Sequence, residues 1–153
     1  LAVCLLEVRG FSKDDFAKYH PGGALGKKLF LRVRDLLALN EIPDVSLDAS
    51  IRDVIIEISE KRLGVTAVTK DRKIIGIITD GDLRRMLAKT DDFSQLCAKD
   101  IMSENPKTIS IDAMAIEAME LMDTHEISQL VVEDQGRYAG IIHIHDLIKE
   151  GII

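Results

Sequence analysis

The sequence predicts an α+β fold in which two tandem helix–strand–strand–helix units pack as a pseudo-twofold pair. An internal repeat is the main observation: residues 76–83 align with residues 140–147, and the offset of 64 positions holds without a gap back to Asp48 over Asp112. Apolar residues recur in both copies at the i, i+3, i+4, i+7 spacing of a helix with one buried face: Ile51, Val54, Ile55 and Ile58, then Ala115, Ala118, Met119 and Met122. A hydrophobic content of 46% with only 4% aromatic residues indicates an aliphatic core.

The elements of the first copy follow from local signals in the chain. Ser50 is expected to begin a helix with Asp53 as its capping-box partner. That helix is expected to run to about Arg62 and to stop near Gly64, because glycine tolerates the left-handed turn that closes a helix. After two strands, Asp82 is expected to be the N-cap of a second helix. The predicted strands and second helix occupy residues 65–69, 74–78 and 83–88.

The second copy repeats the same order of elements. Its helices and strands are predicted over residues 113–125, 129–133, 138–143 and 146–150, after a polar connector at 90–96. Upstream of each copy, Val33–Leu37 matches residues 98–102 once one residue is gapped. Each copy has about 60 residues, which alone would form only a marginal core. The two copies are therefore expected to pack against one another.

Charge and cysteine usage exclude several classes of protein. The chain has 20 basic and 26 acidic residues, a net charge of −6, which argues against a general nucleic-acid binder. Cys4 and Cys97 are far apart and lack a CxxC partner, which excludes a disulfide framework or a cysteine zinc site and suits the cytoplasm. Apolar runs such as 1–6 and 54–58 are too short to span a membrane, and no signal peptide is visible. Because the chain opens on Leu1, we expect it to be a fragment of a longer protein.

The repeat carries a family resemblance. The order of elements, the 64-residue offset and residues 76–83 resemble a tandem pair of CBS domains, covering about residues 33–153. The resemblance implies two CBS repeats, at residues 31–93 and 94–153, that form a compact module. It also implies two clefts, which in that family commonly hold adenosyl or other nucleotide ligands.

Two further segments resemble a particular kind of enzyme. Residues 10–29 resemble the end of the sugar isomerase domain of D-arabinose-5-phosphate isomerases, and residues 145–153 resemble the C-terminus of the same enzymes. The resemblance implies that residues 1–30 are the end of a catalytic domain. Such enzymes convert ribulose 5-phosphate to arabinose 5-phosphate for the synthesis of Kdo, a lipopolysaccharide sugar. The 153 residues alone are expected to be inactive, because the sugar-phosphate site lies upstream.

The first candidate ligand site is the junction of a strand and a helix at Thr79 and Asp82. Free N–H groups at a helix start attract phosphate. The resemblance assigns phosphate binding to the Thr79 hydroxyl and ribose binding to the Asp82 carboxylate. The alternative is purely local, with Asp82 a simple N-cap and Thr79 a strand-end residue. The other residues expected to contact a ligand in this repeat or beside it are Asp80, Gly81, Arg84, Arg85, Val45, Thr66 and Thr108.

The second repeat departs from this pattern. His143 replaces the threonine and His145 replaces Gly81, whereas Asp146 is kept. A ribose contact is therefore retained while the phosphate-binding hydroxyl is lost, although histidine can donate to phosphate and gains charge near pH 6. The two histidines have the spacing of a metal-chelating pair, but without a third ligand nearby we predict no metal. No cofactor is required, and the expected ligand is AMP, ATP, CMP or CMP-Kdo.

His20 is the catalytic candidate. It precedes Pro-Gly-Gly, a segment that lets the backbone approach a ligand closely. Aldose–ketose isomerisation needs a group that moves a proton between adjacent carbons, and imidazole suits that task near neutral pH. The resemblance places a catalytic histidine here, in the parent enzyme only; the alternative is a structural turn histidine.

Three functions are compatible with these patterns. The first is nucleotide sensing that regulates an arabinose-5-phosphate isomerase. The others are a structural oligomerisation module without a ligand, and a nucleotide sensor of an unrelated enzyme. Self-association is expected in each case, and the resemblance implies a dimer of CBS pairs within a tetrameric parent. Four apolar residues near the copy starts are expected to remain exposed for it: Leu36, Leu37, Ile101 and Met102.

Overall fold

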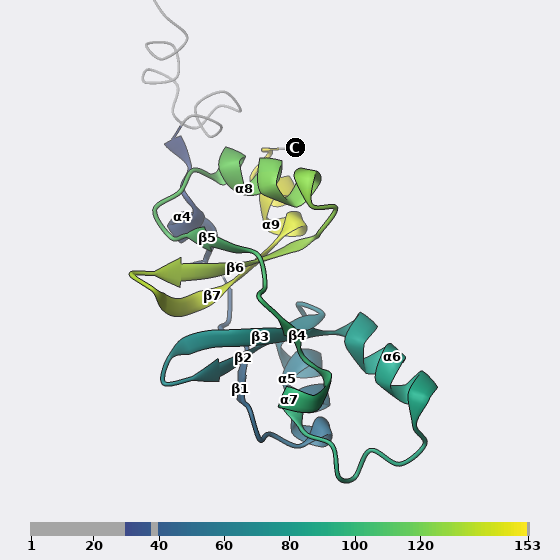
Figure 1. The fold of residues 1–153 in the computed structure, drawn as a ribbon. Helices are drawn as coiled ribbons and strands as arrows, with labels where there is room; N and C mark the ends of the chain where they lie inside the picture. Colours follow the sequence, from purple (N-terminus) through teal and green to yellow (C-terminus); the bar gives the residue numbers. More distant parts are fainter. Residues whose placement is uncertain (1–29, 38–39, 153) are drawn as a thin grey trace, which may run out of the picture.

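The computed structural model describes residues 30–37 and 40–152, which form two stacked α+β units (Figure 1). In the first unit, β1 runs parallel to β2, and β2, β3 and β4 continue antiparallel, in the order β1-β2-β3-β4. Its strands are β1 (Asp44–Ser46), β2 (Val65–Lys70), β3 (Lys73–Thr79) and β4 (Ser103–Glu104), and its helices are α5 (Ile51–Lys61), α6 (Asp80–Lys89) and α7 (Ala98–Ile101).

The second unit has the same topology in the order β5-β6-β7. Its strands are β5 (Thr108–Ser110), β6 (Gln129–Asp134) and β7 (Arg137–His143), and its helices are α4 (Val33–Leu37), α8 (Ala115–Thr124) and α9 (Ile144–Lys149). Even the irregularities repeat: the β2–β3 register shifts after Val68, opposite Gly76, and the β6–β7 register shifts after Val132, opposite Gly140. The predicted fold class, two repeats of one α+β unit, is confirmed.

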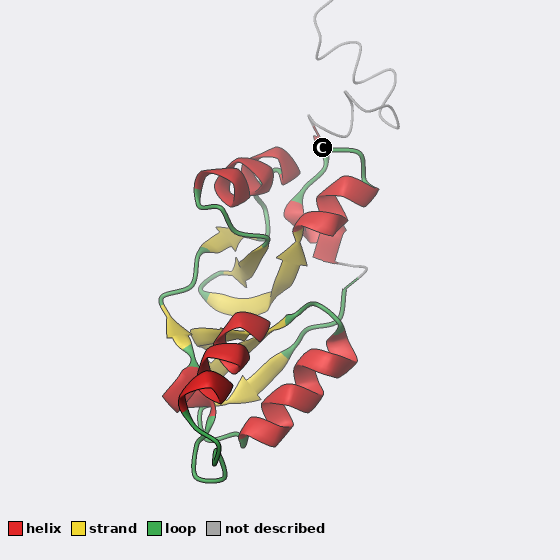
Figure 2. Cartoon of the chain, turned by 90° about the vertical axis from the view of Figure 1, so that its right-hand side faces the viewer, coloured by secondary structure: helices red, strands yellow, loops and turns green. Residues whose placement is uncertain are grey.

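The two sheets face each other and most of the helices cover the outer sides (Figure 2). Val65, Ala67 and Ile141 are fully buried in the cluster that joins β2 and β3 to β7. Tyr138 connects the repeats in two further ways, since its N–H donates to the carbonyl of Arg72 at 2.9 Å and its hydroxyl donates to that of Pro43 at 2.7 Å. The repeats therefore share one interior, as their small size requires.

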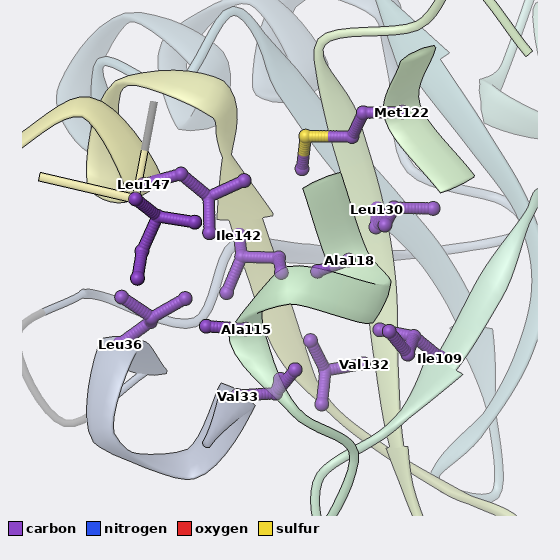
Figure 3. Close-up of a cluster of buried hydrophobic side chains, with 11 residues drawn as sticks. Val33, Leu36, Ile109, Ala115, Ala118, Met122, Leu130, Val132, Ile142 and Leu147 are labelled. Carbon is purple, nitrogen blue, oxygen red and sulfur yellow. The ribbon is translucent and has the colours of Figure 1, made fainter. Parts of the chain in front are cut away.

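The short helices α4 and α7 are exchanged between the repeats. α4 precedes the first repeat in the chain but packs in the core of the second, where Val33 and Leu36 contact α8, β7 and α9 (Figure 3). α7 precedes the second repeat but packs in the core of the first, through Ala98. Equivalent hydrogen bonds fix both helices: Val33 N–H donates to the Ala113 carbonyl at 3.0 Å, and Ala98 N–H donates to that of Ala49 at 2.9 Å.

The exchange corrects the expectation that four apolar residues near the copy starts are exposed. Leu36 is only 2% exposed, and Leu37 packs against the same cluster. Ile101 and Met102 pack against the core of the first repeat. Leu36 is thus unavailable for oligomerisation, and Leu37, Ile101 and Met102 are partly buried in these cores rather than fully exposed.

Both ends of α5 lie where the sequence predicts, but the residue that closes its C-terminal turn differs from the expected glycine. Ser50 is the N-cap, and its Oγ accepts from Asp53 N–H at 3.2 Å and donates to the Asp53 carboxylate at 2.7 Å. The C-cap is Arg62 rather than Gly64, because Arg62 itself adopts the left-handed conformation with φ of 57°. Its N–H still reaches the Ile58 carbonyl at 3.1 Å, which closes the last turn.

Candidate functional site

Thr79 and Asp82 form a reciprocal cap at the start of α6. Thr79 has extended backbone angles, and its hydroxyl oxygen accepts from Asp82 N–H at 3.3 Å. The Asp82 carboxylate accepts in return from Thr79 N–H at 2.8 Å and from the Thr79 hydroxyl at 2.7 Å. The prediction that Asp82 is the N-cap is therefore wrong: Thr79 is the N-cap, and Asp82 is the acidic third residue of a capping box.

The carboxylate of Asp82 is buried and held by donors from three sides. Arg85 donates to its Oδ1 at 2.6 Å, and the hydroxyl of Ser103 in β4 donates to the same atom at 3.1 Å. Burial alone would raise the pKa of Asp82, but the hydrogen bonds from Thr79, Arg85 and Ser103 outweigh it and hold the pKa below its ordinary value. The group is thus an ionised acceptor in a fixed orientation, which suits recognition of ligand hydroxyls.

A cavity of about 220 Å³ lies beside Asp82, between α6 and α7. The polar and charged residues that line it include Asp82, Arg85, Lys89, Thr90 and Asp100. Arg85 is shared between this cavity and the Asp82 carboxylate, so a ligand with both hydroxyl and phosphate groups would contact the arginine and the aspartate together.

The equivalent junction in the second repeat is capped by histidine. His143 N–H donates to the Asp146 carboxylate at 2.8 Å, and Nδ1 of His143 accepts from His145 N–H at 3.1 Å. The two imidazole rings stack with centroids 4.6 Å apart. Burial, the charge of His145 and the charge of Lys149 lower the pKa of His143, against the opposing effect of Asp146. His143 is therefore neutral at neutral pH, as its acceptor role at Nδ1 requires.

Asp146 is as buried as its counterpart but has different partners. Its Oδ2 accepts from the side-chain amide of Asn40 at 2.8 Å, and Lys149 Nζ lies 3.9 Å from Oδ1. A cavity of about 310 Å³ opens beside it and is lined by residues from both repeats. The charged and imidazole groups around this cavity are Glu41, Lys61, Arg62, His143, His145, Asp146 and Lys149.

The structure distributes the predicted site residues unevenly. Asp82 and Arg85 line the first cavity, and His143, His145 and Asp146 line the second. Asp80 and Gly81 form the first turn of α6, and Arg84 is exposed on the same helix outside both cavities. The other three candidates lie apart from them: Val45 in the core of the first repeat, Thr66 fully buried in β2, and Thr108 exposed on β5. His20 lies outside the described residues.

Four polar residues around the second cavity were not predicted. Asn40 and Glu41 precede β1, and Lys61 and Arg62 end α5, so all four come from outside the second repeat. A basic pair at a helix end is typical of a solvated terminus, and nothing in the repeat pattern marks it as part of a site. Among residues 30–37 and 40–152, no three His, Cys, Asp or Glu side chains converge as a metal site would require, and no helix is long and apolar enough to cross a membrane.

Comparison with known families decides the identity of the fold. The model of the CBS domain family matches the chain twice, at residues 33–89 and 98–152. The chain belongs to the CBS domain family. A CBS domain structure, NE2398, has a TM-score of 0.71 over 80% of this chain and 98% of its own length, at 24% identity, which supports the fold alone. The CBS domain protein PAE2072 from Pyrobaculum aerophilum, solved in complex with AMP, has a TM-score of 0.69 and 26% identity over 76% of this chain and 90% of its own length.

Curated relatives confirm the narrower resemblance to arabinose-5-phosphate isomerases. Arabinose 5-phosphate isomerase KdsD of Escherichia coli (strain K12) is 43% identical over 155 aligned residues, which cover 100% of this chain and 47% of the enzyme. The enzyme of the same name from Francisella tularensis is 47% identical over 151 residues, 97% of this chain and 46% of its own length. The CBS chain thus spans about half the length of the curated relatives it matches.

Proposed function

We propose that this CBS pair is the nucleotide-sensing regulatory module of an arabinose-5-phosphate isomerase. The observation that carries the proposal is a pair of symmetry-related buried carboxylates, Asp82 and Asp146, each beside a cavity that also has basic side chains. A fixed carboxylate is suited to accept hydrogen bonds from ribose hydroxyls, and Arg or Lys beside it is suited to phosphate. The CBS relative solved with AMP supports a nucleoside phosphate as the ligand class.

The contacts of Asp82 suggest how occupancy would be transmitted. Its carboxylate holds α6 through Arg85 and holds β4 through Ser103, and β4 follows directly after the exchanged helix α7. A ligand whose hydroxyls replace the Ser103 or Arg85 donors would change the contact between α6 and this connecting segment. Regulation then requires that the ligand bind two states of the parent enzyme with different affinity.

Thermal stability with added nucleotides tests the proposal. A ligand present at 100 times its Kd stabilises the folded state by about 2.7 kcal/mol. We expect AMP, ATP, CMP or CMP-Kdo at millimolar concentration to raise the melting temperature, and the double variant D82A/D146A to abolish the increase. The matched control is Asp91→Ala, an exposed carboxylate in the connector, which should keep the increase. If none of the four compounds raises the melting temperature, the sensing function is wrong.

The catalytic role belongs to the parent enzyme. We assign His20 as the group that moves a proton in the conversion of ribulose 5-phosphate to arabinose 5-phosphate, on the basis of the resemblance of residues 10–29 to the end of that catalytic domain. In the intact enzyme, His20→Ala should lower kcat by about 10²-fold or more with an unchanged melting temperature. Full turnover in this variant, or simple unfolding, would make His20 structural. The 153 residues by themselves should show no turnover.

A second function, self-association, is favoured by a separate observation. The outer helices expose large apolar side chains: Ile55 and Ile56 on α5, Leu87 on α6 and Ile148 on α9, each between 37% and 52% exposed. An open cavity of about 620 Å³ between α8 and α9 is also mainly apolar, with Met119, Met122, Ile127 and Ile144 in its lining. We infer that these helix faces pair with a second copy of the chain, as a dimer of CBS pairs that forms part of a tetrameric parent.

Sedimentation at micromolar concentration tests this second function. The wild-type chain should sediment as a dimer, and Ile148→Lys should shift it toward the 17.0 kDa monomer without loss of secondary structure. Lys70→Glu, an exposed charge change at the end of β2, is the control and should leave the dimer intact. A wild-type monomer across that range would contradict self-association. A dimer without nucleotide binding would leave oligomerisation as the only role of the module.

Two observations bear on the parent protein and its compartment. The alignment of the whole chain with KdsD disfavours an unrelated parent enzyme. The free Cys97 thiol suits the cytoplasm as the proposed compartment.

A further inference from the structure

The cavity beside Asp146 is built from both repeats and is rich in basic groups. Lys61 and Arg62 reach it from the end of α5, and Lys149 reaches it from α9. The stacked rings of His143 and His145 form another part of its lining. At about 310 Å³, the cavity is near the lower end of the range of ~300–1,000 Å³ for small-molecule sites.

The charge of the lining depends on the histidines. Glu41 pairs with Lys61, and Asp146 is 3.9 Å from Lys149. With both imidazoles neutral, the three basic side chains exceed the two carboxylates of the lining by one positive charge. Protonation of both rings would raise the excess to three positive charges. Two further carboxylates lie close to residues of this lining: Glu150 shares a separate small cavity with Asp146, and Asp80 lies beside Gly64.

The hydrogen bond between the histidines decides which ring can accept a proton. Nδ1 of His143 accepts from His145 N–H, so a proton added there would break this bond. The bond uses the backbone N–H of His145, so the exposed ring of His145 takes no part in it. A doubly charged anion in the cavity stabilises the imidazolium form and offsets the repulsion from Lys61, Arg62 and Lys149.

We propose that this cavity binds a doubly charged phosphate-type anion and that binding takes up a proton at the His143–His145 pair. The inference rests on the proposed function, because the anion would be the phosphate group of the sensed nucleotide. It makes the two sites different in kind. The lining of the first cavity includes Asp82, Arg85 and Lys89 but no histidine, whereas the second cavity binds more tightly as pH falls.

Sulfate is the probe that isolates this effect, because it remains a dianion between pH 6 and pH 8 whereas phosphate monoesters titrate in that range. Calorimetry at constant ionic strength should show the Kd for sulfate falling about tenfold from pH 8 to pH 6, as expected for an average uptake of about half a proton on binding over this range. Titrations at pH 7 in buffers of different ionisation enthalpy should show net proton uptake. A Kd that is independent of pH, or release of protons, would overturn the proposal.

Variants that copy the first repeat provide the second measurement. His143→Thr introduces the residue type that caps α6 in the first repeat, and His145→Gly introduces the equivalent of Gly81. Both variants should therefore fold. Each variant should bind sulfate with a reduced pH dependence, and the double variant should show none. A double variant with the wild-type pH dependence would assign the proton to another group and overturn the proposal.

A pair of arginine variants at opposite ends of α5 tests the location. Arg62→Ala should weaken sulfate binding about tenfold, whereas Arg52→Ala, an exposed arginine in the first turn of α5, should change it less than twofold. Equal effects would mean non-specific attraction and would overturn the site. Nucleotide binding without proton uptake would refute only this inference, whereas the absence of any nucleotide binding would refute the proposed function itself.

Discussion

Replacement of Leu36 by alanine tests the exchange of α4 between the repeats. Leu36 precedes the first repeat in the chain, yet its side chain is 2% exposed and packs among Ala115, Ile142 and Leu147 of the second (Figure 3). Buried Leu→Ala changes cost about 2–5 kcal/mol, depending on how far the site can collapse. Collapse is restricted here, because backbone hydrogen bonds from Val33 and Arg34 hold α4 in place.

We therefore expect Leu36→Ala to lower the free energy of unfolding by about 3 kcal/mol. Urea denaturation of the 153-residue chain is the assay, with methyl NMR spectra to locate the disturbance. Methyl groups of Ile142 and Leu147 should shift, whereas those of Val45 in the first repeat should not. The matched control is Leu87→Ala, since this leucine is 52% exposed and its loss should change stability by less than about 0.5 kcal/mol.

Two results would refute the reasoning. A cost below 1 kcal/mol would mean that α4 does not complete the second core in solution. A full cost accompanied by shifts at Val45 rather than Leu147 would mean that α4 packs on its own repeat. Either result would also remove the reason given above for discarding Leu36 as an oligomerisation surface.

Three further predictions follow from single contacts. Tyr138→Phe removes the hydrogen bond from the hydroxyl to the Pro43 carbonyl and should cost about 1 kcal/mol in urea denaturation; no loss of stability would mean that the bond contributes nothing to joining the repeats. The pKa of Asp82 in the folded state is depressed, so its contribution to stability is present above the unfolded value near 3.8 and is lost as pH falls through the folded pKa. In urea denaturation at a series of pH values, Asp82→Asn should reduce the loss of stability at acid pH, and an unchanged loss would contradict the prediction. Gly76→Ala should cost about 1–3 kcal/mol, because a Cβ there would lie 2.8 Å from the carbonyl oxygen of Ser103, whereas Ala88→Gly on the exposed face of α6 should cost only about 0.5–1 kcal/mol and serves as the control.

Periodicity predicted the repeated unit because it reflects burial within one element. The i, i+3, i+4, i+7 pattern marks the buried faces of α5 and α8, although Ile55 at the edge of the α5 face is 37% exposed. The alternation of strand and turn signals marks the two hairpins. Both properties are local, so they survive without knowledge of the partner. The identical register shifts after Val68 and Val132 show that the 64-residue offset extends to backbone geometry.

Local signals fail where two residues compete for the same role. Thr79 and Asp82 are both favourable N-cap residues, and the choice between them depends on the residue at which the preceding strand ends. β3 continues to Thr79, so the threonine has the extended backbone of a cap and the aspartate falls in the first turn. Arg62 was missed as a C-cap for a similar reason, since left-handed arginine has no sequence signal when a glycine follows two residues later.

The candidate site was only half predictable, because only half of it belongs to the repeat. Asp82, Arg85, His143, His145 and Asp146 occupy equivalent or neighbouring positions in the two copies, and alignment of the copies finds them. Asn40, Lys61 and Arg62 reach the second cavity from the other repeat. Their placement depends on how the two sheets face one another, and a single sequence does not contain that information.

The exchange of helices gives a physical reason for the glycine that opens the motif in both copies. A Cβ on Gly76 would lie 2.8 Å from the Ser103 carbonyl oxygen and 2.9 Å from the sulfur of Met102, in the segment that follows α7. A Cβ on Gly140 would lie 2.7 Å from a methyl group of Leu37, the last residue of α4. In each repeat, the glycine therefore makes room for the exchanged segment, which precedes the other repeat in the chain. The motif of residues 76–83 and 140–147 therefore has two structural roles. It begins a helix that holds a buried carboxylate, and its glycine leaves the space that the exchanged helix segment occupies.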